Sequence, residues 1–424
     1  MNETDVIVVG AGPTGLMLAC ELALAGVRCR LLERRTEQPN ITRAFAVHAR
    51  TLELLDARDL AGDLLARGLR VHEVQPAPGA TLDLRSLETR FPMILIVPQS
   101  GTEHVLEARA RELGVEIVRG AEVTGIRQDA RRVELDLADG RTESAAYVVG
   151  CDGAHSAVRR LIGVDFAGRQ YETHILLADV RLTAPPGQAL FATGNDAGVV
   201  IMVPFGDGWF RAIAWDRLRE QIALTVPLPM EEMRDAFHRI AGTDFGMSEQ
   251  RWSSRFRSER RQARHYRVGR VFLAGDAAHV HSRFGPTRRI LAGRLTGLGI
   301  AYPAATRGAH PWTGRRMPDL ACEGGRLYEL LRDGCFRLVD MTASGAVAEA
   351  VASAAPEVQV TRYAGPARPG RPAVILVRPD GYVAWASSGH PDLPARAAAE
   401  AARWSGPHPA DELNAAWIER YRQE

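Results

Sequence analysis

The chain has 424 residues, of which 46% are hydrophobic and 25% are charged, a composition typical of soluble globular proteins. Its formal net charge is only +2, which gives no indication of a nucleic-acid partner. All 53 basic residues are arginine, a bias that we attribute to a GC-rich genome rather than to chemistry. The length predicts two or three domains.

The cysteines and the start of the chain indicate its compartment. None of the five cysteines belongs to a C-x-x-C pair, so we expect free thiols in a reducing cytosol (Cys20, Cys29, Cys151, Cys322, Cys335). The first predicted strand begins within five residues of Met1, which leaves no room for a signal peptide. No apolar run reaches the roughly 18 residues that a membrane-spanning helix needs. The sequence therefore predicts a cytoplasmic protein with no membrane segment.

A strand–turn–helix–strand unit opens the chain. Asp5 to Val9 is an apolar, β-branched run typical of a buried parallel strand. The turn that follows reads Gly10-Ala11-Gly12-Pro13-Thr14-Gly15. A helix is predicted over Leu16 to Ala25, and a second strand over Val27 to Leu32, directly before Glu33.

The turn has the G-x-G-x-x-G spacing of dinucleotide-binding proteins. In such a unit the first glycine allows a tight turn, the second lets a pyrophosphate approach the backbone, and the third lets helix and strand pack closely. Those positions are Gly10, Gly12 and Gly15 here. Glu33 lies about 20 residues further on, where an acid accepts hydrogen bonds from a ribose. The pattern predicts a dinucleotide site; the alternative is a glycine-rich turn without a ligand.

Helices and strands alternate over the next hundred residues. We expect helices over about His48 to Leu65 and over Thr102 to Leu113. Arg43, near the first of them, is equally compatible with a flavin or phosphate contact and with a solvated charge. Three strands are predicted after the second helix, over Val115–Val118, Val123–Gln128 and Val133–Leu137.

Two later buried strands end in acidic turns. The strand from Ala145 runs into Cys151-Asp152-Gly153, and the strand from Arg270 runs into Gly275-Asp276. Asp152-Gly153 could close its strand as an ordinary turn or form a second phosphate-end loop. For Asp152-Gly153 the local pattern alone favours the ordinary turn, because Asp-Gly is common in turns.

Residues 163–270 are rich in β-strand signals, and we expect a mostly antiparallel sheet with one amphipathic helix, Met230 to Gly242. Such a sheet could cover an apolar pocket. Its large apolar side chains are compatible both with a large planar ligand and with an ordinary core (Met202, Phe205, Trp209, Phe210, Trp215). Residues 336–424 predict a small α/β domain. His279 and His281 lack a third ligand, so no metal site is predicted.

Taken in order, three features resemble one family. They are Gly10 to Gly15 with Glu33, then Cys151-Asp152-Gly153 with Ser156, Arg159 and Arg160, then Gly275-Asp276-Ala277-Ala278-His279. The chain resembles class A FAD-dependent aromatic monooxygenases, above all the actinobacterial enzymes that act on polyketides and rifampicin-type antibiotics. The resemblance covers residues 5–285 and resumes at about residue 290.

The resemblance implies an α/β fold in three parts. A three-layer Rossmann-type FAD-binding domain would comprise residues 1–165 with 266–300. A mostly antiparallel β-sheet substrate domain would be inserted into it, from residues 70–100 and 166–265. Residues 301–424 would form a linker and a thioredoxin-like α/β domain, for which no redox role is expected because it lacks a cysteine pair.

The resemblance also implies cofactor contacts, and neither a catalytic side chain nor a metal ligand. The first loop, with Gly10, Gly12, Pro13, Thr14 and Gly15, would hold the FAD pyrophosphate. The other implied contacts are Glu33 and Arg34 to the adenosine ribose, Arg43 and Gln99 on the flavin side, Val123 against the adenine, Asp152 and Gly153 serving FAD and NAD(P)H, and Gly275 and Asp276 at the ribityl chain.

The reaction that the resemblance implies is aromatic hydroxylation. NAD(P)H would reduce FAD, O2 would add to the flavin as a C4a-hydroperoxide, and an aromatic polyketide or antibiotic would be hydroxylated in antibiotic biosynthesis or resistance. Such an enzyme would act as a monomer or homodimer. An NAD-linked dehydrogenase would need only the first glycine motif and would leave Asp152-Gly153 and Gly275-Asp276 unexplained.

One segment departs from the family. After Gly285 the chain lacks the Gly-rich loop and long helix that normally follow, so several tens of residues are missing. Their backbone N–H groups would face the flavin and stabilise negative charge on its reduced ring. The alternative function is therefore a catalytically impaired FAD- or ligand-binding remnant that acts as a non-enzymatic partner protein.

Overall fold

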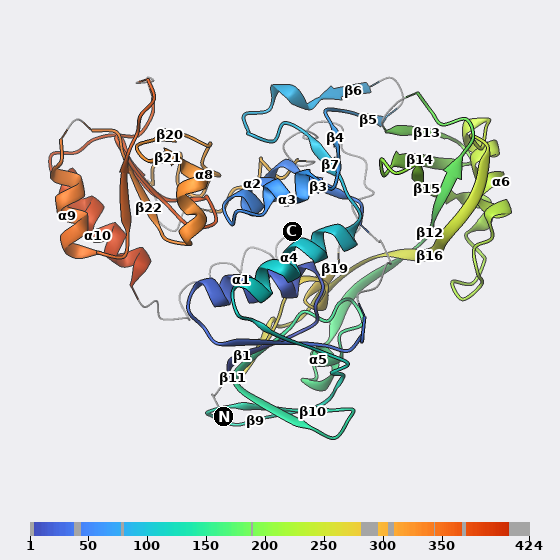
Figure 1. The fold of residues 1–424 in the computed structure, drawn as a ribbon, viewed down its shortest axis with the longest axis horizontal. Helices are drawn as coiled ribbons and strands as arrows, with labels where there is room; N and C mark the ends of the chain where they lie inside the picture. The colour runs from blue at the N-terminus through green and yellow to red at the C-terminus, as the bar shows by residue number, and fades with distance from the viewer. Residues whose placement is uncertain are drawn as a thin grey trace. The chain divides into compact units, whose positions relative to one another are not determined.

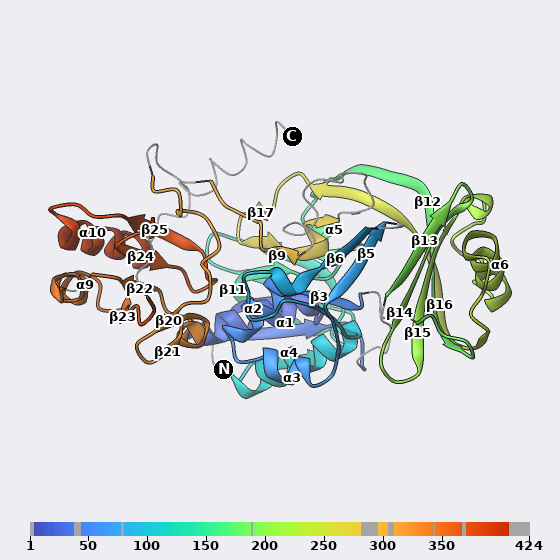
Figure 2. The same cartoon turned by 90° about the horizontal axis from the view of Figure 1, so that it is seen from above.

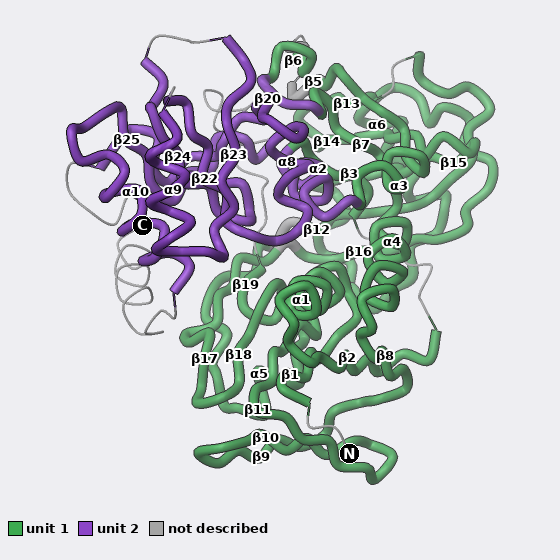
Figure 3. The backbone as a smooth tube through the Cα atoms, turned by 60° about the vertical axis from the view of Figure 1, so that its left-hand side comes forward, with its two compact units in different colours: residues 1–49, 60–87, 91–295 green, residues 50–59, 88–90, 296–424 purple. Residues whose placement is uncertain are grey.

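The computed structural model describes residues 4–37, 44–77, 80–187, 190–280, 296–303, 309–342, 344–366 and 370–406. The chain divides into two compact units (Figure 3). Unit 1 comprises residues 1–49, 60–87 and 91–295, and unit 2 comprises residues 50–59, 88–90 and 296–424.

Unit 1 is built on a sheet whose central strands are parallel. The strand order is β17 (Arg267–Val268), β18 (Val271–Leu273), β11 (Thr142–Gly150), β1 (Thr4–Val9), β2 (Cys29–Glu33) and β8 (Glu116–Arg119). All neighbours from β18 to β8 pair in parallel. The sheet continues antiparallel from β11 into β10 (Val133–Leu137) and β9 (Val123–Gln128).

Helices and a folded-back hairpin cover the two faces of this sheet. The helices α1 (Pro13–Leu24) and α4 (Gln99–Glu112) pack together on one face (Figures 1 and 2). On the other face, the short helix α5 (Ala157–Leu161) packs with β9 and β10. Ile7 and Leu32 of the parallel strands are fully buried in the core on that side, with Val158 of α5. This burial explains the continuous apolar runs of the strands.

A second sheet in unit 1 is antiparallel. Its strand order is β13 (Phe191–Asn195), β14 (Gly198–Pro204), β15 (Trp209–Asp216), β12 (Phe166–Leu182), β16 (Met247–Ala263) and β19 (His279–Val280). The helix α6 (Met230–Ala241) covers one face of it and ends at Gly242, whose φ is 77° (Figure 2). A turn of 3₁₀ helix, η2 (Arg217–Arg219), follows β15.

Several smaller elements lie between residues 46 and 96 of the chain. A three-stranded sheet has the order β3 (Ala46–His48), β7 (Ile94–Ile96) and β4 (Leu69–Val71). A hairpin of β5 (Glu73–Ala77) and β6 (Ala80–Asp83) precedes η1 (Leu84–Ser86). The helix predicted over His48 to Leu65 is wrong, because the chain forms two helices, α2 (Ala49–Asp56) and α3 (Ala61–Leu65). Asp59 between them has a φ of 61°, a left-handed conformation that interrupts the helix.

Unit 2 contains a four-stranded mixed sheet in the order β23 (Gln359–Arg362), β22 (Arg337–Asp340), β24 (Val374–Val377) and β25 (Val383–Ser387). The helices α9 (Ala346–Ala354) and α10 (Leu393–Ser405) pack on one face. The other face packs against α8 (Leu327–Leu330), η4 (Leu331–Asp333) and Ala57, which follows α2. A short hairpin joins β20 (Ala321–Cys322) and β21 (Gly325–Arg326).

The predicted combination of a parallel α/β sheet, an antiparallel sheet and a small C-terminal α/β unit is confirmed. All five cysteines are free, as expected. Burial raises the pKa of Cys151 to about 12 and that of Cys20 to about 11, so these thiols remain protonated at neutral pH. Among the described residues, no helix is both long and apolar enough to span a bilayer.

Candidate functional site: the carboxyl edge of the parallel sheet

Four neighbouring parallel strands of unit 1 end at the same edge. The glycine loop follows β1, Glu33 ends β2, Cys151 to Gly153 follow β11, and the turn η3 (Gly275–Ala277) comes shortly after β18. Backbone hydrogen bonds continue past the strand ends. The Cys151 N–H donates to the Val9 carbonyl at 2.8 Å, and the Ala274 N–H donates to the Gly150 carbonyl at 2.9 Å. The fold thus brings together the three motifs at the edge where open α/β sheets bind ligands.

The three glycines of the first loop have different reasons to be glycine. Gly10 has a φ of 109°, and a Cβ there would lie 2.6 Å from the Cys151 carbonyl oxygen. A Cβ on Gly15 would lie 1.9 Å from the Gly10 carbonyl oxygen. Gly12 has an ordinary φ of −78°, and a Cβ there would meet nothing within 4 Å. Packing therefore demands Gly10 and Gly15, whereas Gly12 borders open space, which fits the close approach of a ligand.

The start of α1 is suited to an anion. Gly12 is its N-cap residue and offers no side-chain cap, and the first turn contains no acidic residue. Pro13 occupies the first helical position, where its missing N–H costs no hydrogen bond. The N–H groups of that turn and the positive end of the helix dipole are thus available to a phosphate.

Glu33 ties the glycine loop to the end of β2. Its side chain is buried, and one carboxylate oxygen accepts the Ala11 N–H at 2.8 Å while the other accepts the Arg35 N–H at 2.9 Å. A carboxylate has about four acceptor sites, so two backbone bonds leave capacity for ribose hydroxyls. Arg34, which directly follows Glu33 in the chain, is exposed.

The Asp152 side chain has a clear local role. Its carboxylate accepts hydrogen bonds from the Ser156 hydroxyl and from the N–H groups of Ala157 at 2.7 Å and Val158 at 3.1 Å. These bonds hold the first turn of α5, a role for the side chain that was not predicted from the sequence. Gly153, with a φ of 84° and open space at its Cβ position, leaves the adjacent backbone accessible.

Arg159 of α5 links the second and third loops. Its guanidinium donates to the Ala277 carbonyl at 2.9 Å and to the Ala154 carbonyl at 2.8 Å. It also lies over the Phe166 ring, 3.8 Å from the ring centroid. Because Arg159 is buried, these contacts fix the spacing between the two loops. The sequence showed Arg159 only as part of a motif and did not reveal this bridge.

The third loop contacts the first. Gly275 has a φ of 60°, and a Cβ there would lie 2.6 Å from the Thr14 hydroxyl oxygen. Asp276 is exposed, and within the described part of the chain its carboxylate has no hydrogen bond or ion pair. An exposed acid without a protein partner, at the edge where the strands end, is available to hydroxyl groups of a ligand.

Gln99 begins α4 beside the chain that follows Arg43. Its side-chain oxygen accepts the Ala44 N–H at 3.3 Å, and its side-chain nitrogen donates to Glu103 at 2.7 Å. Arg43 itself lies outside the described residues, as does His281. Val123 is buried in the core that packs α5 against the sheet.

Sequence reasoning missed Glu103, which is only 6% exposed. Burial raises its pKa above the ordinary value, a shift partly offset by the hydrogen bond from Gln99 and by the charge of Arg35. The Glu33 carboxylate acts on it in the same direction as burial, so the two acids share one electrostatic environment. The only sequence signal was the i, i+4 spacing from Gln99 along α4.

The face of the antiparallel sheet opposite α6 is lined by apolar side chains. Ile175, Leu177 and Ile213 are buried there, packed against half-buried Phe45, Trp215 and Trp252. Phe45 comes two residues after Arg43, which ties this face to the region near Gln99. Met202 and Phe210 pack in the core beneath α6 instead, so their positions give no support to the planar-ligand interpretation.

Comparisons with known proteins agree with this geometry. A family model for an FAD-binding domain matches residues 3–286, and one for the C-terminal region of aromatic-ring hydroxylases matches residues 310–408. The chain is 33% identical to 12-dehydrotetracycline 5-monooxygenase/anhydrotetracycline 6-monooxygenase of Streptomyces rimosus, over 95% of this chain and 99% of the relative. It is 34% identical to rifampicin monooxygenase of Streptomyces venezuelae, over 92% and 97%. The solved structure of an anhydrotetracycline hydroxylase from Streptomyces rimosus matches with a TM-score of 0.80 and 33% identity, over 96% of this chain and 99% of the other.

The chain therefore belongs to the FAD-binding family of aromatic-ring hydroxylases. It is an FAD-dependent aromatic monooxygenase, as the three motifs implied. The alignment with the tetracycline enzyme extends over 510 positions, whereas this chain has only 424 residues. Tens of residues of the relative thus face gaps in this chain. The segment where the sequence predicted a deletion, after Gly285, lies outside the described residues.

Proposed function

We propose that this protein uses NAD(P)H to hydroxylate an aromatic polyketide or antibiotic. The substrate class comes from the relatives, whose names specify tetracycline intermediates and rifampicin. When bound, FAD supplies the chemistry that activates O2. The chain's own residues would bind and orient the cofactor and the substrate and exclude water from them.

The observation that carries the proposal is the contrast among the three glycines. Gly10 and Gly15 are required by contacts within the protein, whereas Gly12 faces open space beside an uncapped helix start. A ligand that approaches the backbone there would give Gly12 a reason to lack a side chain. We assign the pyrophosphate to this position.

We assign the other cofactor contacts from the positions of the residues around the same edge of the parallel sheet. Glu33 would accept hydrogen bonds from the adenosine ribose, because its two backbone bonds leave acceptor capacity. Asp276 would bind the ribityl hydroxyls. Gln99 and, as the family resemblance implies, Arg43 would contact the flavin side of the cofactor. Gly153 would offer accessible backbone, while Asp152 holds α5 in place.

The apolar sheet face gives the substrate a surface. Phe45, Trp215 and Trp252 present half-buried aromatic side chains on the side away from α6. Flat aromatic rings stack favourably on such side chains. We propose that the substrate ring lies against this face, which would also keep water from the reacting atoms.

The sequence also raised a second function, a remnant without turnover, which the comparisons do not support. If the missing residues include the donors that face the flavin, reduced FAD would be poorly stabilised, and loss of one such donor set costs about 3 kcal/mol in comparable sites. The protein would then bind FAD or a ligand without turnover and act as a partner protein.

One experiment separates the two functions. Purified protein saturated with FAD is given NADPH or NADH, with and without an anhydrotetracycline-type phenol, and both coenzyme oxidation and hydroxylated product are measured. We expect the phenol to accelerate oxidation and to yield product. FAD binding without substrate-stimulated oxidation by either coenzyme would contradict the proposed activity on this class of phenol.

A further inference from the structure

Unit 2 contains a hollow of about 580 Å³, far in sequence from the cofactor motifs. Its walls come from residues 88–90, from residues between 312 and 326, and from Tyr363, Gly370 and Arg371. They include two aromatic rings and several charged groups (Arg90, Trp312, Asp319, Arg326, Tyr363, Arg371). The volume lies within the range of about 300–1,000 Å³ that small-molecule sites occupy.

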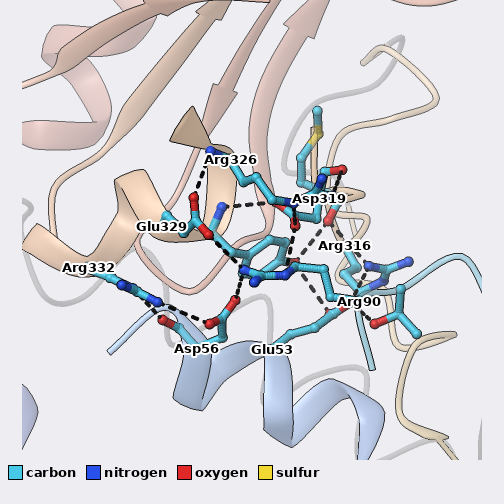
Figure 4. Close-up of polar contacts among 11 residues, drawn as sticks. Glu53, Asp56, Arg90, Arg316, Asp319, Arg326, Glu329 and Arg332 are labelled. Carbon is cyan, nitrogen blue, oxygen red and sulfur yellow. Dashed lines mark hydrogen bonds and ion pairs between the residues drawn. The ribbon is translucent and has the colours of Figure 1, made fainter. Parts of the chain in front are cut away.

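Two of the three arginines in the wall are already neutralised. Arg326 and Arg90 both approach Asp319, at 2.6 Å and 3.8 Å, and Arg90 also pairs with Asp56 at 2.7 Å and Glu329 at 3.2 Å (Figure 4). The Asp319 side chain is only 4% exposed. These pairs hold the wall rigid, and they leave little positive charge for a ligand.

A buried network lies behind this wall. Glu53 is 1% exposed and accepts hydrogen bonds from Thr89 at 2.7 Å and from Arg316 at 2.8 Å (Figure 4). Thr89 and Arg90 are adjacent in the chain, so the Glu53 contacts fix the stretch that forms one side of the hollow. A hollow with a fixed wall is preformed, which reduces the cost of binding.

Arg371 differs from the other two arginines. Within the described part of the chain it forms no ion pair, and its buried Nη1 atom has no hydrogen-bond partner. Its guanidinium lies over the Tyr363 ring, 5.1 Å from the ring centroid. A half-buried cation without an acid partner, stacked on an aromatic ring, is the arrangement that recognises a carboxylate or phosphate.

We propose that this hollow binds a planar aromatic ring that carries one anionic group. The anion pairs with Arg371, and the ring packs against the side chains of Tyr363 and Trp312. An aromatic carboxylate and the phosphate of a nucleotide share this chemistry. All the residues that line the site belong to unit 2.

The test is calorimetric titration of the full, FAD-saturated chain with two probes, 2-naphthoate and adenosine monophosphate. We expect at least one probe to bind. If naphthoate binds, the uncharged 2-naphthamide should bind at least tenfold more weakly. Arg371→Gln should weaken the binding at least about tenfold, the effect of losing a charge-assisted hydrogen bond. Arg371→Lys, which keeps the charge, should lose less.

Two controls keep the result specific. Arg403→Gln removes an exposed arginine of α10 that pairs with Glu400, and it should leave probe binding unchanged. Tyr363→Phe keeps the ring and should bind as the wild type does, whereas Tyr363→Leu should bind more weakly. Binding of neither probe, or binding that Arg371→Gln leaves within twofold, would overturn the proposal.

Discussion

At Gly12 the fold would tolerate a side chain, whereas the proposed pyrophosphate contact would not. Its φ of −78° suits any residue, and its Cβ position is empty. Serine is a favourable N-cap residue, so Gly12→Ser should leave the melting temperature of the FAD-free protein unchanged or slightly raised. The same side chain would occupy the space of the pyrophosphate, and we expect FAD affinity to fall roughly tenfold or more. Differential scanning fluorimetry and FAD titration measure the two effects.

Gly62 provides the matched control for that substitution. It also has nothing within 4 Å of its Cβ position, but it lies in α3, away from the loop that follows β1. Gly62→Ser should leave FAD affinity as it is in the wild type. If Gly12→Ser bound FAD equally well, the pyrophosphate assignment would be wrong.

Glu103 gives a pH-dependent prediction. Burial raises its pKa in the folded protein above the unfolded value of about 4.3. Its contribution to the free energy of unfolding is therefore fully present below that unfolded pKa and is lost as the pH rises through the folded pKa. Glutamine does not ionise, so Glu103→Gln avoids this loss of stability. The variant should therefore have a higher melting temperature than the wild type at neutral pH, and the difference should shrink in acid.

Glu107, one turn further along α4, should behave in the opposite way. Burial opposes its ionisation, but hydrogen bonds from Arg111 and Arg119 outweigh that effect and lower its pKa. Its stabilisation is present above the unfolded pKa and is lost as the pH falls through the lowered folded pKa. Glu107→Gln should therefore destabilise at neutral pH and less so in acid. Identical pH profiles for the two variants would contradict the assignment of Glu103.

At the scale of elements, α5 depends on Asp152. The helix has only five residues, so its first turn needs the three hydrogen bonds that the carboxylate accepts. Asp152→Ala should lower the free energy of unfolding by about 1–3 kcal/mol, measured by urea unfolding of the FAD-free protein. FAD affinity should change little if the side chain serves only α5. A large loss of FAD affinity without a loss of stability would indicate a direct cofactor contact instead.

The Glu53 network is the corresponding feature of unit 2. Glu53 accepts hydrogen bonds from Arg50 and Arg316, whose side chains are 6% and 9% exposed. Glu53→Ala leaves both cations without that carboxylate, and removal of one partner of a buried ion pair costs about 3–5 kcal/mol. We expect a large drop in the unfolding midpoint by circular dichroism. Glu329→Gln, at a side chain 36% exposed, should cost less than about 1 kcal/mol, and equal effects would contradict the account.

The elements that the sequence predicted are those with local signals. The β1–α1–β2 unit was predictable because apolar runs, a glycine pattern and an acid at a fixed spacing lie within thirty residues. The break between α2 and α3 was not, because the left-handed conformation of Asp59 has no marker in the apolar pattern. Helix α10 also went unpredicted, although its alanine-rich sequence favours a helix.

For the whole molecule, contacts between residues far apart in the sequence could not be predicted from the sequence. The bridge from Arg159 to Ala277 spans 118 residues, and the bond from Arg316 to Glu53 spans 263. Such pairs depend on how distant parts of the chain pack together, which no local sequence pattern encodes. The motifs could still be placed together, since strands that pair in parallel bring their carboxyl ends to one edge.

The gaps in the alignment also concern the whole molecule. A monooxygenase that lacks tens of residues found in its relative must hold FAD with what remains at the carboxyl edge of the parallel sheet. The residues proposed to bind the pyrophosphate and the adenosine ribose, Gly12 and Glu33, both lie within the described residues. We therefore expect cofactor binding to survive, even if turnover is slower than in the relatives.

Calorimetric titration of FAD into the purified, FAD-free chain tests this central claim most directly. The account predicts one site per chain, with affinity that falls at least about tenfold in both Gly12→Ser and Glu33→Gln. A wild-type chain that takes up no FAD, or variants that bind it as tightly as the wild type, would contradict it.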